Sequence, residues 1–401
     1  MEQIVTKFSN RMIYILSAIG FFGIFSTTIS KNPVLPLFVH DLGGSEAVLG
    51  LIAAISPLAG IIFSFPIGFL IDKIGQKKLL FVSAMVFVTA PVLYAFVINP
   101  WYLIPIRFFH GLATAILGPL SATMIFHAYP QNKGEKLGFY SSATLIGRTL
   151  APLLGGVVIT SFLYLGGLWN YRLVYFLAAI VSLPILFLAF AVKTENHDVS
   201  ENKSLTLDDF LQTFKNFIHH GRLLTTAFVE MATYFTFGVL ETYLPLYLHD
   251  CGYSGSKIGL IFSLQILAIA LSKPFFGKIA DRIDKRVQII VGMLILGLSI
   301  IPIPFVTNFY LITALSMLFG VGMSVSTVAT NSYVGDITPK SELGASMGAL
   351  SAIMDIGHSS GPFITGLIIT YLSFSAGFWF APVVCLMMTG LFVVVNFRKI
   401  V

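Results

Sequence analysis

The sequence predicts an all-α membrane protein, with twelve transmembrane helices in two pseudo-symmetric six-helix bundles. Charged residues make up only 10% of the 401 residues, whereas a soluble domain has about 25%. Hydrophobic residues make up 56%, which is more than a soluble fold of this length can bury. Strands are excluded because alternating segments of about 10 residues do not recur.

Twelve runs supply the roughly 20 mostly apolar residues that a spanning helix needs. The first run is too long for a signal-peptide core and lacks a small-residue cleavage site, so it counts as a span. Cys251 is expected in a loop and Cys385 within a helix, so no disulfide is expected. The expected spans cover residues 11–39, 46–71, 79–98, 101–128, 136–164, 171–192, 222–249, 255–277, 286–305, 309–334, 342–371 and 375–397.

The longest polar segment, residues 193–221, divides the chain into an N-terminal bundle (1–192) and a C-terminal bundle (222–401). Within this linker, Thr206 is placed to cap a short amphipathic helix. Such a helix is expected to lie on the membrane surface, and docking of a partner is the alternative role. Its apolar side would consist of Leu207, Phe210, Phe214 and Phe217.

Basic residues set the expected orientation. Eighteen Lys and Arg lie in the termini, the linker and the loops of one side, and two lie on the other. The side rich in Lys and Arg faces the cytoplasm. Both termini and the linker are therefore expected in the cytoplasm, with Cys251 outside the cell membrane. The net charge of +6 reflects this topology, since the basic residues form no patch for nucleic acid.

The two halves repeat at an offset of about 209 residues. Residues 35–45 read LPLFVHDLGGS and residues 244–254 read LPLYLHDCGYS. Gly147–Gly156 likewise aligns with Gly357–Gly366. Two similar bundles related by an axis along the membrane normal are expected to enclose a cavity at their interface, an architecture that serves alternating access.

At these residues the chain resembles the major facilitator superfamily over its whole length. The signature of that family between the second and third helices is G-x-L-x-D-[RK]-x-G-[RK]-[RK]-[RK], and one position, Gln76, departs from it. The second copy has Asp284 where the glycine would be. The matching residues are Gly68, Leu70, Asp72, Lys73, Gly75, Lys77 and Lys78, and in the second copy Gly277, Asp281, Arg282, Lys285 and Arg286.

The expected helix over 136–164 narrows the resemblance to the twelve-helix drug:proton antiporters, which carry G-x8-G-x3-G-P-x2-G-G there. Ala151 replaces one glycine of that motif. The expected helix over 342–371 carries a second copy with Thr365 as its departure. The motif residues are Gly138, Gly147, Pro152, Gly155 and Gly156, and in the second copy Gly348, Gly357, Gly361, Pro362 and Gly366.

The resemblance implies a cytoplasmic gate. Asp72 would cap a helix of the other half and hold the gate shut, and Asp281 with Arg282 and Arg286 would form a second latch. The alternative is that these residues are basic anchors with a balancing acid. Glycines at positions such as Gly68 and Gly277 would permit close helix approach. Pro152 and Pro362 would mark a kink or a tight contact between the halves.

Ionisable groups at membrane depth are costly and are functional candidates by default. Glu230 and Glu241 lie about 20° apart around one helix, with Tyr234 and Phe237 on the same face. An acidic and aromatic stripe suits an organic cation. Glu241 is the first candidate for proton coupling, whereas Glu230 could simply be hydrated. The neighbourhood of Glu241 also resembles the acid of bacterial quinolone exporters.

Asp355 is a further candidate that could reach the cavity. Arg107 and His110 lie on a polar face of the expected helix over 101–128, where Arg107 could pair with a carboxylate and release it on protonation. His110 and His358 are expected to be hydrogen-bonded residues rather than proton carriers. A buried pair with an acid of the second half would explain Arg148. The segment Lys31-Asn32-Pro33 is expected to break the first helix toward the outside. Lys31 would line the outer cavity or reach up to water.

The sequence therefore predicts proton-coupled efflux of a small organic molecule. Uptake of a small nutrient, export of a zwitterionic metabolite such as a siderophore, and a non-transporting receptor are the alternatives. No metal-site spacing and no phosphate-binding loop occur, so we expect no cofactor and no enzymatic activity. The expected partners are substrate, protons and lipid, and the chain is expected to act as a monomer.

Overall fold

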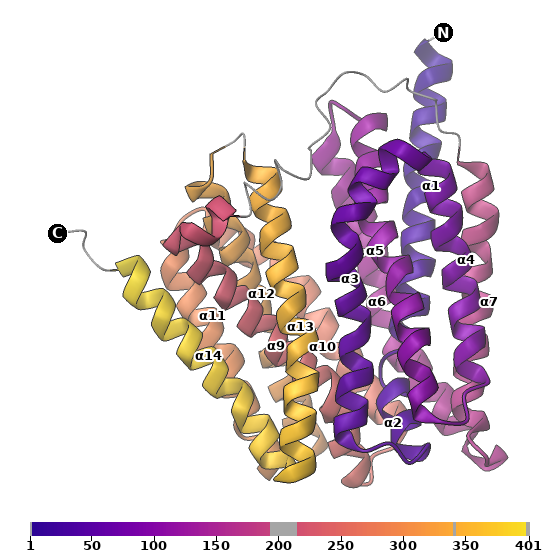
Figure 1. The fold of residues 1–401 in the computed structure, drawn as a ribbon, viewed down its shortest axis with the longest axis vertical. Coiled ribbons are helices and arrows are strands. Elements are labelled where there is room, and N and C mark those ends of the chain that lie inside the picture. Colours follow the sequence, from indigo (N-terminus) through magenta and orange to yellow (C-terminus); the bar gives the residue numbers. More distant parts are fainter. Residues whose placement is uncertain (1, 193–214, 340–341, 398–401) are drawn as a thin grey trace. The chain divides into compact units, whose positions relative to one another are not determined.

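The structure is a computed structural model that describes residues 2–192, 215–339 and 342–397, and within these ranges every regular element is helical (Figure 1). The predicted fold class is confirmed. Twelve of the described helices have 16 residues or more: α1 (Glu2–Ile29), α3 (Glu46–Ile74), α4 (Gln76–Ala95), α5 (Leu103–Ala128), α6 (Lys133–Ser161), α7 (Trp169–Ala191), α9 (Gly221–Asp250), α10 (Gly255–Ala280), α11 (Lys285–Ile300), α12 (Phe309–Ile337), α13 (Leu343–Tyr371) and α14 (Phe374–Phe397).

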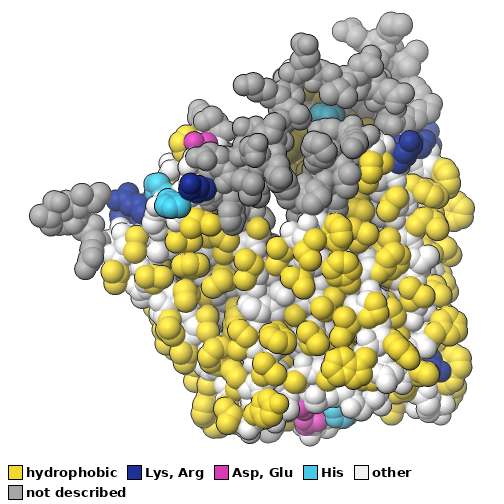
Figure 2. All heavy atoms as spheres, viewed as in Figure 1, with side chains coloured by type: hydrophobic (Ala, Val, Ile, Leu, Met, Phe, Trp, Pro, Cys, Tyr) yellow, Lys and Arg dark blue, Asp and Glu magenta, His cyan; other side chains and the backbone are white. Residues whose placement is uncertain are grey.

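The described helices provide eleven candidate membrane spans by length and hydropathy, and α13 is a further helix of 29 residues. Large apolar side chains are exposed on them, among them Phe187, Leu271 and Leu298. On the face drawn in Figure 2, hydrophobic side chains cover the middle, and the described charged side chains lie toward the upper and lower edges. Since exposed apolar bands of this kind face lipid, the chain is a multi-pass membrane protein.

By backbone contacts the chain forms two units. Unit 1 consists of Met1–Gly43, Leu58–Ser204 and Ser254–Ser263, and unit 2 consists of Gly44–Pro57, Leu205–Tyr253 and Leu264–Val401. Parts of α3 and α10 thus belong with the other half of the sequence. The domain boundaries at residues 192 and 222 stay a prediction.

In unit 1, α1 packs on α6 and α7, and α4 packs on α5 and α7. The expected break at Lys31 is present, because α1 ends at Ile29 and a turn leads into the short α2 (Val34–Asp41). Glycines of α6 face this first span. A Cβ on Gly147 would lie 2.7 Å from the carbonyl oxygen of Phe21, so this helix pair depends on the missing side chain.

In unit 2, α9 is the central helix and packs on α13, α14 and α12. In unit 2 α13 packs on α9, and in unit 1 its counterpart α6 packs on α1. A Cβ on Gly357 or Gly361 would overlap the carbonyl oxygens of Met231 and Phe235 on α9. Unlike the first span, α9 runs unbroken to Asp250.

Most of the predicted amphipathic helix in the linker lies outside the described residues. The described part begins at residue 215, and Phe217 from that part is only 1% exposed. Its side chain packs in a hydrophobic cluster of unit 2 with Leu223, Ala227 and Val334. Phe217 therefore anchors the start of unit 2 rather than facing a membrane surface.

The packing of α13 on α9 gives a first prediction. Gly361→Ala should lower the free energy of unfolding by about 1–3 kcal/mol, because a new methyl group meets backbone atoms that cannot swing aside. Gly348→Ala is the matched control on the same helix, since nothing lies within 4 Å of its Cβ position. Thermal unfolding in detergent measures both variants. Equal stabilities of the two variants would contradict this account of the packing.

Candidate functional site

Glu241 on α9 and His358 on α13 form a buried acid–base pair. The His358 Nε2 and Glu241 Oε2 atoms are 3.1 Å apart, and the two side chains are 18% and 10% exposed. The rings of Tyr234 and Phe237 pack on the imidazole at 6.0 and 5.6 Å. His358 is hydrogen-bonded, as predicted, and its partner is Glu241, a pairing that was not predicted.

Two prolines mark the positions of this pair. In an α-helix the N–H of residue i+4 bonds to the carbonyl of residue i, and proline has no N–H. Pro245 therefore leaves the carbonyl of Glu241 without its helical donor, and Pro362 does the same for His358. The hydroxyl of Tyr243 donates to the Pro362 carbonyl at 2.6 Å.

Glu230 occupies a second polar site on α9. Its carboxyl group is 3% exposed and accepts a hydrogen bond of 2.5 Å from Thr330 on α12. Glu230 is therefore buried and hydrogen-bonded to protein rather than exposed at the end of α9. It lines a cavity of about 430 Å³, and the positive charge of Lys273 acts on its carboxylate. Further polar groups around this cavity come from Tyr234, Thr327, Asn331, Ser332 and Ser351.

Unit 1 holds a buried basic group on α5. Arg107 and His110 are each 1% exposed. The hydroxyl of Thr27 is 3.2 Å from His110 Nε2, and the ring of Tyr94 lies 5.7 Å from the imidazole. The guanidinium acts electrostatically on Tyr94. The predicted polar face is thus packed within unit 1, and Arg107 makes no ion pair with any carboxylate among the described residues.

The remaining intramembrane candidates are less enclosed. Arg148 is exposed and has no ion pair within the described ranges. Its predicted pair with an acid of the second half stays a prediction. Lys31 and Asp355 are half-buried. Their predicted roles stay predictions.

The helices that follow the two copies of the signature, α4 and α11, begin differently. Gly75 has φ +94°, a left-handed conformation that favours glycine, directly before α4. Its counterpart Asp284 has φ −62° and caps α11 by accepting a hydrogen bond from the backbone N–H of Arg286 at 2.9 Å. The close approach expected at Gly277 is absent, since nothing lies within 4 Å of its Cβ position. The side chains of Asp72 and Lys73 are outside the described set.

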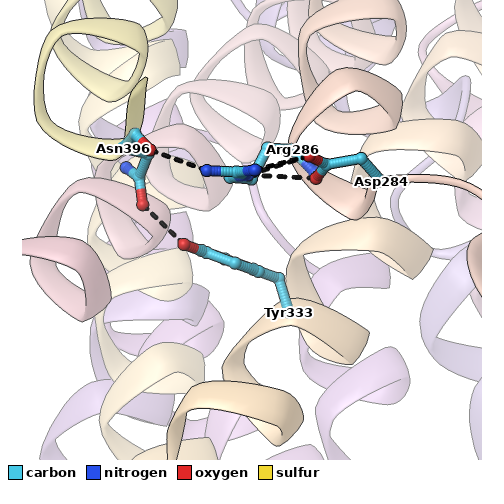
Figure 3. A network of polar contacts seen from close by, with 4 residues as sticks. All are labelled: Asp284, Arg286, Tyr333 and Asn396. Carbon is cyan, nitrogen blue, oxygen red and sulfur yellow. Dashed lines mark hydrogen bonds and ion pairs between the residues drawn. The ribbon is translucent and has the colours of Figure 1, made fainter. Parts of the chain in front are cut away.

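The second copy forms a helix-end cluster of Asp284, Arg286, Tyr333 and Asn396 (Figure 3). Arg286 bonds the Asp284 carboxylate at 2.6 Å and the Asn396 carbonyl at 2.9 Å. The Asn396 side chain accepts from the Tyr333 hydroxyl at 2.7 Å and donates to Thr225 at 3.0 Å. The cluster joins the ends of α9, α11, α12 and α14. The expected partner of Arg286, Asp281, is exposed instead.

Acid–base groups within membrane spans of this kind are candidates for ion and substrate paths. The profile of the Major Facilitator Superfamily matches residues 12–256 and 226–399. The chain belongs to this family, which confirms the resemblance of its motifs.

Several relatives are named as drug transporters. The chain is 27% identical to the multi-drug resistance efflux pump PmrA homolog of Lactococcus lactis, over 94% of this chain and 91% of that protein. It is 28% identical to the multidrug resistance protein MdtG of Proteus mirabilis, over 91% and 92%. The solved nucleoside transporter NupG has the same fold, with a TM-score of 0.80 at 12% identity and coverage of 97% and 99%.

The helix-end cluster gives a second prediction. The Arg286 guanidinium beside Asp284 lowers the pKa of that carboxyl below its ordinary value of 3.8. A lowered pKa means that the ion pair stabilises the fold above pH 3.8, and that this contribution is lost as the pH falls through the folded value. Asp284→Asn keeps the capping oxygen but loses the charge. Because Asp284 is 40% exposed, we expect a loss of at most about 1 kcal/mol at pH 7.

Thermal unfolding between pH 7 and pH 3 measures this difference. The difference in the free energy of unfolding between the wild type and Asp284→Asn should become smaller toward pH 3. Asp284→Ala is the comparison that also removes the cap, and it should cost about 1 kcal/mol more at every pH. A gap that widens in acid would contradict the assignment.

Proposed function

We propose that the chain is a proton-coupled exporter of small organic molecules, drug-like compounds or metabolites, that works by alternating access. The observation that carries the proposal is the Glu241–His358 pair. A carboxylate with little access to water needs a proton or a cation to offset its charge. A group of this kind responds both to the proton and to a cationic substrate.

Coupling follows from competition at one carboxylate. When Glu241 binds a proton, it offers no charge to a cationic substrate, and when it holds the substrate, it releases the proton. The imidazole of His358 lies 3.1 Å from the carboxyl group of Glu241. It can therefore accept the proton that Glu241 releases and return it, as histidine does in proton transfer. Binding of proton and binding of substrate then weaken one another reciprocally.

The surroundings of Glu241 favour an organic cation. Tyr234 and Phe237 lie beside the pair, and Phe237 stacks on Phe319 at 6.5 Å. Aromatic faces next to a carboxylate attract cations through charge and through their π electrons. The names of the relatives, an efflux pump and multidrug resistance proteins, favour export over uptake.

Export of a zwitterionic metabolite is the second candidate. The cavity at Glu230 presents both an acid and a base, Glu230 and Lys273, which would suit a substrate with both charges. Transport in everted vesicles separates the two candidates and the alternative of uptake. An acidic interior should drive ethidium inward if the protein exports cations, whereas a nutrient symporter would move its substrate the other way.

The third prediction concerns Glu241. Glu241→Gln mimics the protonated state, so proton-driven efflux should fall on the order of a hundredfold while the protein still folds. Release of protons from purified protein on addition of ethidium should also vanish. Fluorescence of ethidium and of a pH dye in vesicles measures the two effects.

Asp355→Asn on α13 is the matched control, because it also removes one acid from a span but leaves the Glu241–His358 pair intact. It should retain both activities. Proton release that survives Glu241→Gln but disappears in Asp355→Asn would move the coupling role to Asp355.

The proposal includes the membrane orientation of the chain, with both termini in the cytoplasm, and action as a monomer. Under this orientation Asp72 and Asp281 would lie at the cytoplasmic gate. Asp72→Asn should weaken the closed gate and shift the population toward states open to the cytoplasm.

Cys251 provides the fourth prediction, a test of orientation. It lies between α9 and α10 and is half-buried, and burial raises the pKa of its thiol above 9.0. An impermeant maleimide should label it in intact cells, slowly at pH 7 and faster as the pH rises, because the thiolate reacts. Mass spectrometry measures the label, and Cys251→Ser is the control. Labelling only after permeabilisation would reverse the orientation.

A further inference from the structure

Glu241 and Glu230 belong to one continuous chain of contacts within unit 2. Glu241 is bonded to His358, and the ring of His358 touches the ring of Tyr234. Tyr234 also lines the cavity that holds Glu230. The sequence gives no local sign of these contacts, because His358 and the cavity residues of α12 come from helices far from α9 in the chain.

We propose that protons pass between Glu241 and Glu230 through His358 and the hydroxyl of Tyr234, so that unit 2 contains a two-carboxylate proton path along one face of α9. This inference rests on the proposed function, because it extends the route of the proton beyond the Glu241–His358 pair. It assigns Glu230 as a second proton-binding residue.

The geometry of α9 spaces the two acids along the membrane-crossing direction. They are 11 residues apart, which is about 16 Å of helix rise and about 20° of rotation. Glu230 is nine residues from the start of α9 at Gly221, and Glu241 is nine residues from its end at Asp250. Each carboxyl group therefore lies about a third of the way in from one end of the helix.

Tyr234 is the residue that bridges the gap. It follows Glu230 by four residues, so the two side chains are neighbours on one helix face. Helical side chains lean toward the N-terminal turn, which brings the phenol toward Glu230. A hydroxyl both donates and accepts a hydrogen bond, so Tyr234 can take a proton on its oxygen while it gives one up. The cavity of about 430 Å³ that Tyr234 and Glu230 line has room for water next to the Tyr234 side chain.

The charged surroundings suit proton exchange at each end. His358 faces Glu241, and the positive charge of Lys273 on α10 acts on Glu230. From α12, Thr330 brings a neutral hydroxyl. α14 brings Cys385, which contacts Thr236 of α9 and lies off the path. A proton that arrives at Glu230 can leave through the cavity as the carboxylate becomes paired with Lys273.

Two transport assays in proteoliposomes test the path with ethidium as the probe. Proton-driven efflux needs net proton movement, whereas exchange of ethidium at equal pH needs only binding and the conformational change. Tyr234→Phe, which keeps the aromatic ring, and Glu230→Gln should each reduce proton-driven efflux about tenfold or more, a much larger loss than either variant causes in exchange. Glu230→Asp, which keeps a titratable group, should restore part of the efflux.

Tyr247→Phe is the matched control, since it removes a hydroxyl from the same helix that bonds the Val306 carbonyl and lies off the path. It should leave both assays unchanged. Full proton-driven efflux in Tyr234→Phe or in Glu230→Gln would overturn the path, and so would equal losses in efflux and exchange. If the wild type shows no proton-driven efflux of ethidium, or if Glu241→Gln leaves it intact, the proposed function itself fails and the path fails with it.

Discussion

The close packing of α13 on α9 is the constraint on which the rest of unit 2 depends. Gly357 and Gly361 leave no side chain between the two backbones, and dispersion between closely packed helices replaces the hydrophobic drive that lipid does not provide. This approach brings His358 within 3.1 Å of Glu241. It also surrounds the pair with apolar and aromatic groups, so that the charge interaction takes place at low dielectric.

The repeat shows why the acid–base pair occurs in the second half only. With an offset of 209 residues Glu241 corresponds to Asn32, and with an offset of 210 His358 corresponds to Arg148. The prolines four residues on are shared, at positions 36, 152, 245 and 362. In the first copy the span breaks before Val34 and Asn32 is neutral. In the second copy α9 stays continuous and presents a carboxylate, so only unit 2 has an acid at this place.

The helix-end cluster and the acid–base groups occupy different parts of unit 2. The helix-end cluster joins four helices through Asn396 and Arg286, and Asp284 serves as cap and counter-ion in a place where Gly75 uses a left-handed conformation. The acid–base groups lie deeper along α9. A rigid end of this kind would keep Glu230 on α9 and Thr330 on α12 in register, which the proposed proton path requires.

The sequence by itself determined the helical class, the spans, the repeat, the family and the short list of ionisable groups, because hydropathy and helical period are local properties of the chain. It also placed the break at Lys31 and the small residues of α13. Only the tertiary structure decided the partners. Glu241 pairs with His358, Glu230 is buried against Thr330, and Arg286 pairs with Asp284. Arg148 is exposed, and nothing lies within 4 Å of the Cβ position of Gly277. These contacts depend on which helix faces meet, and residues more than 100 positions apart carry no local signal of that.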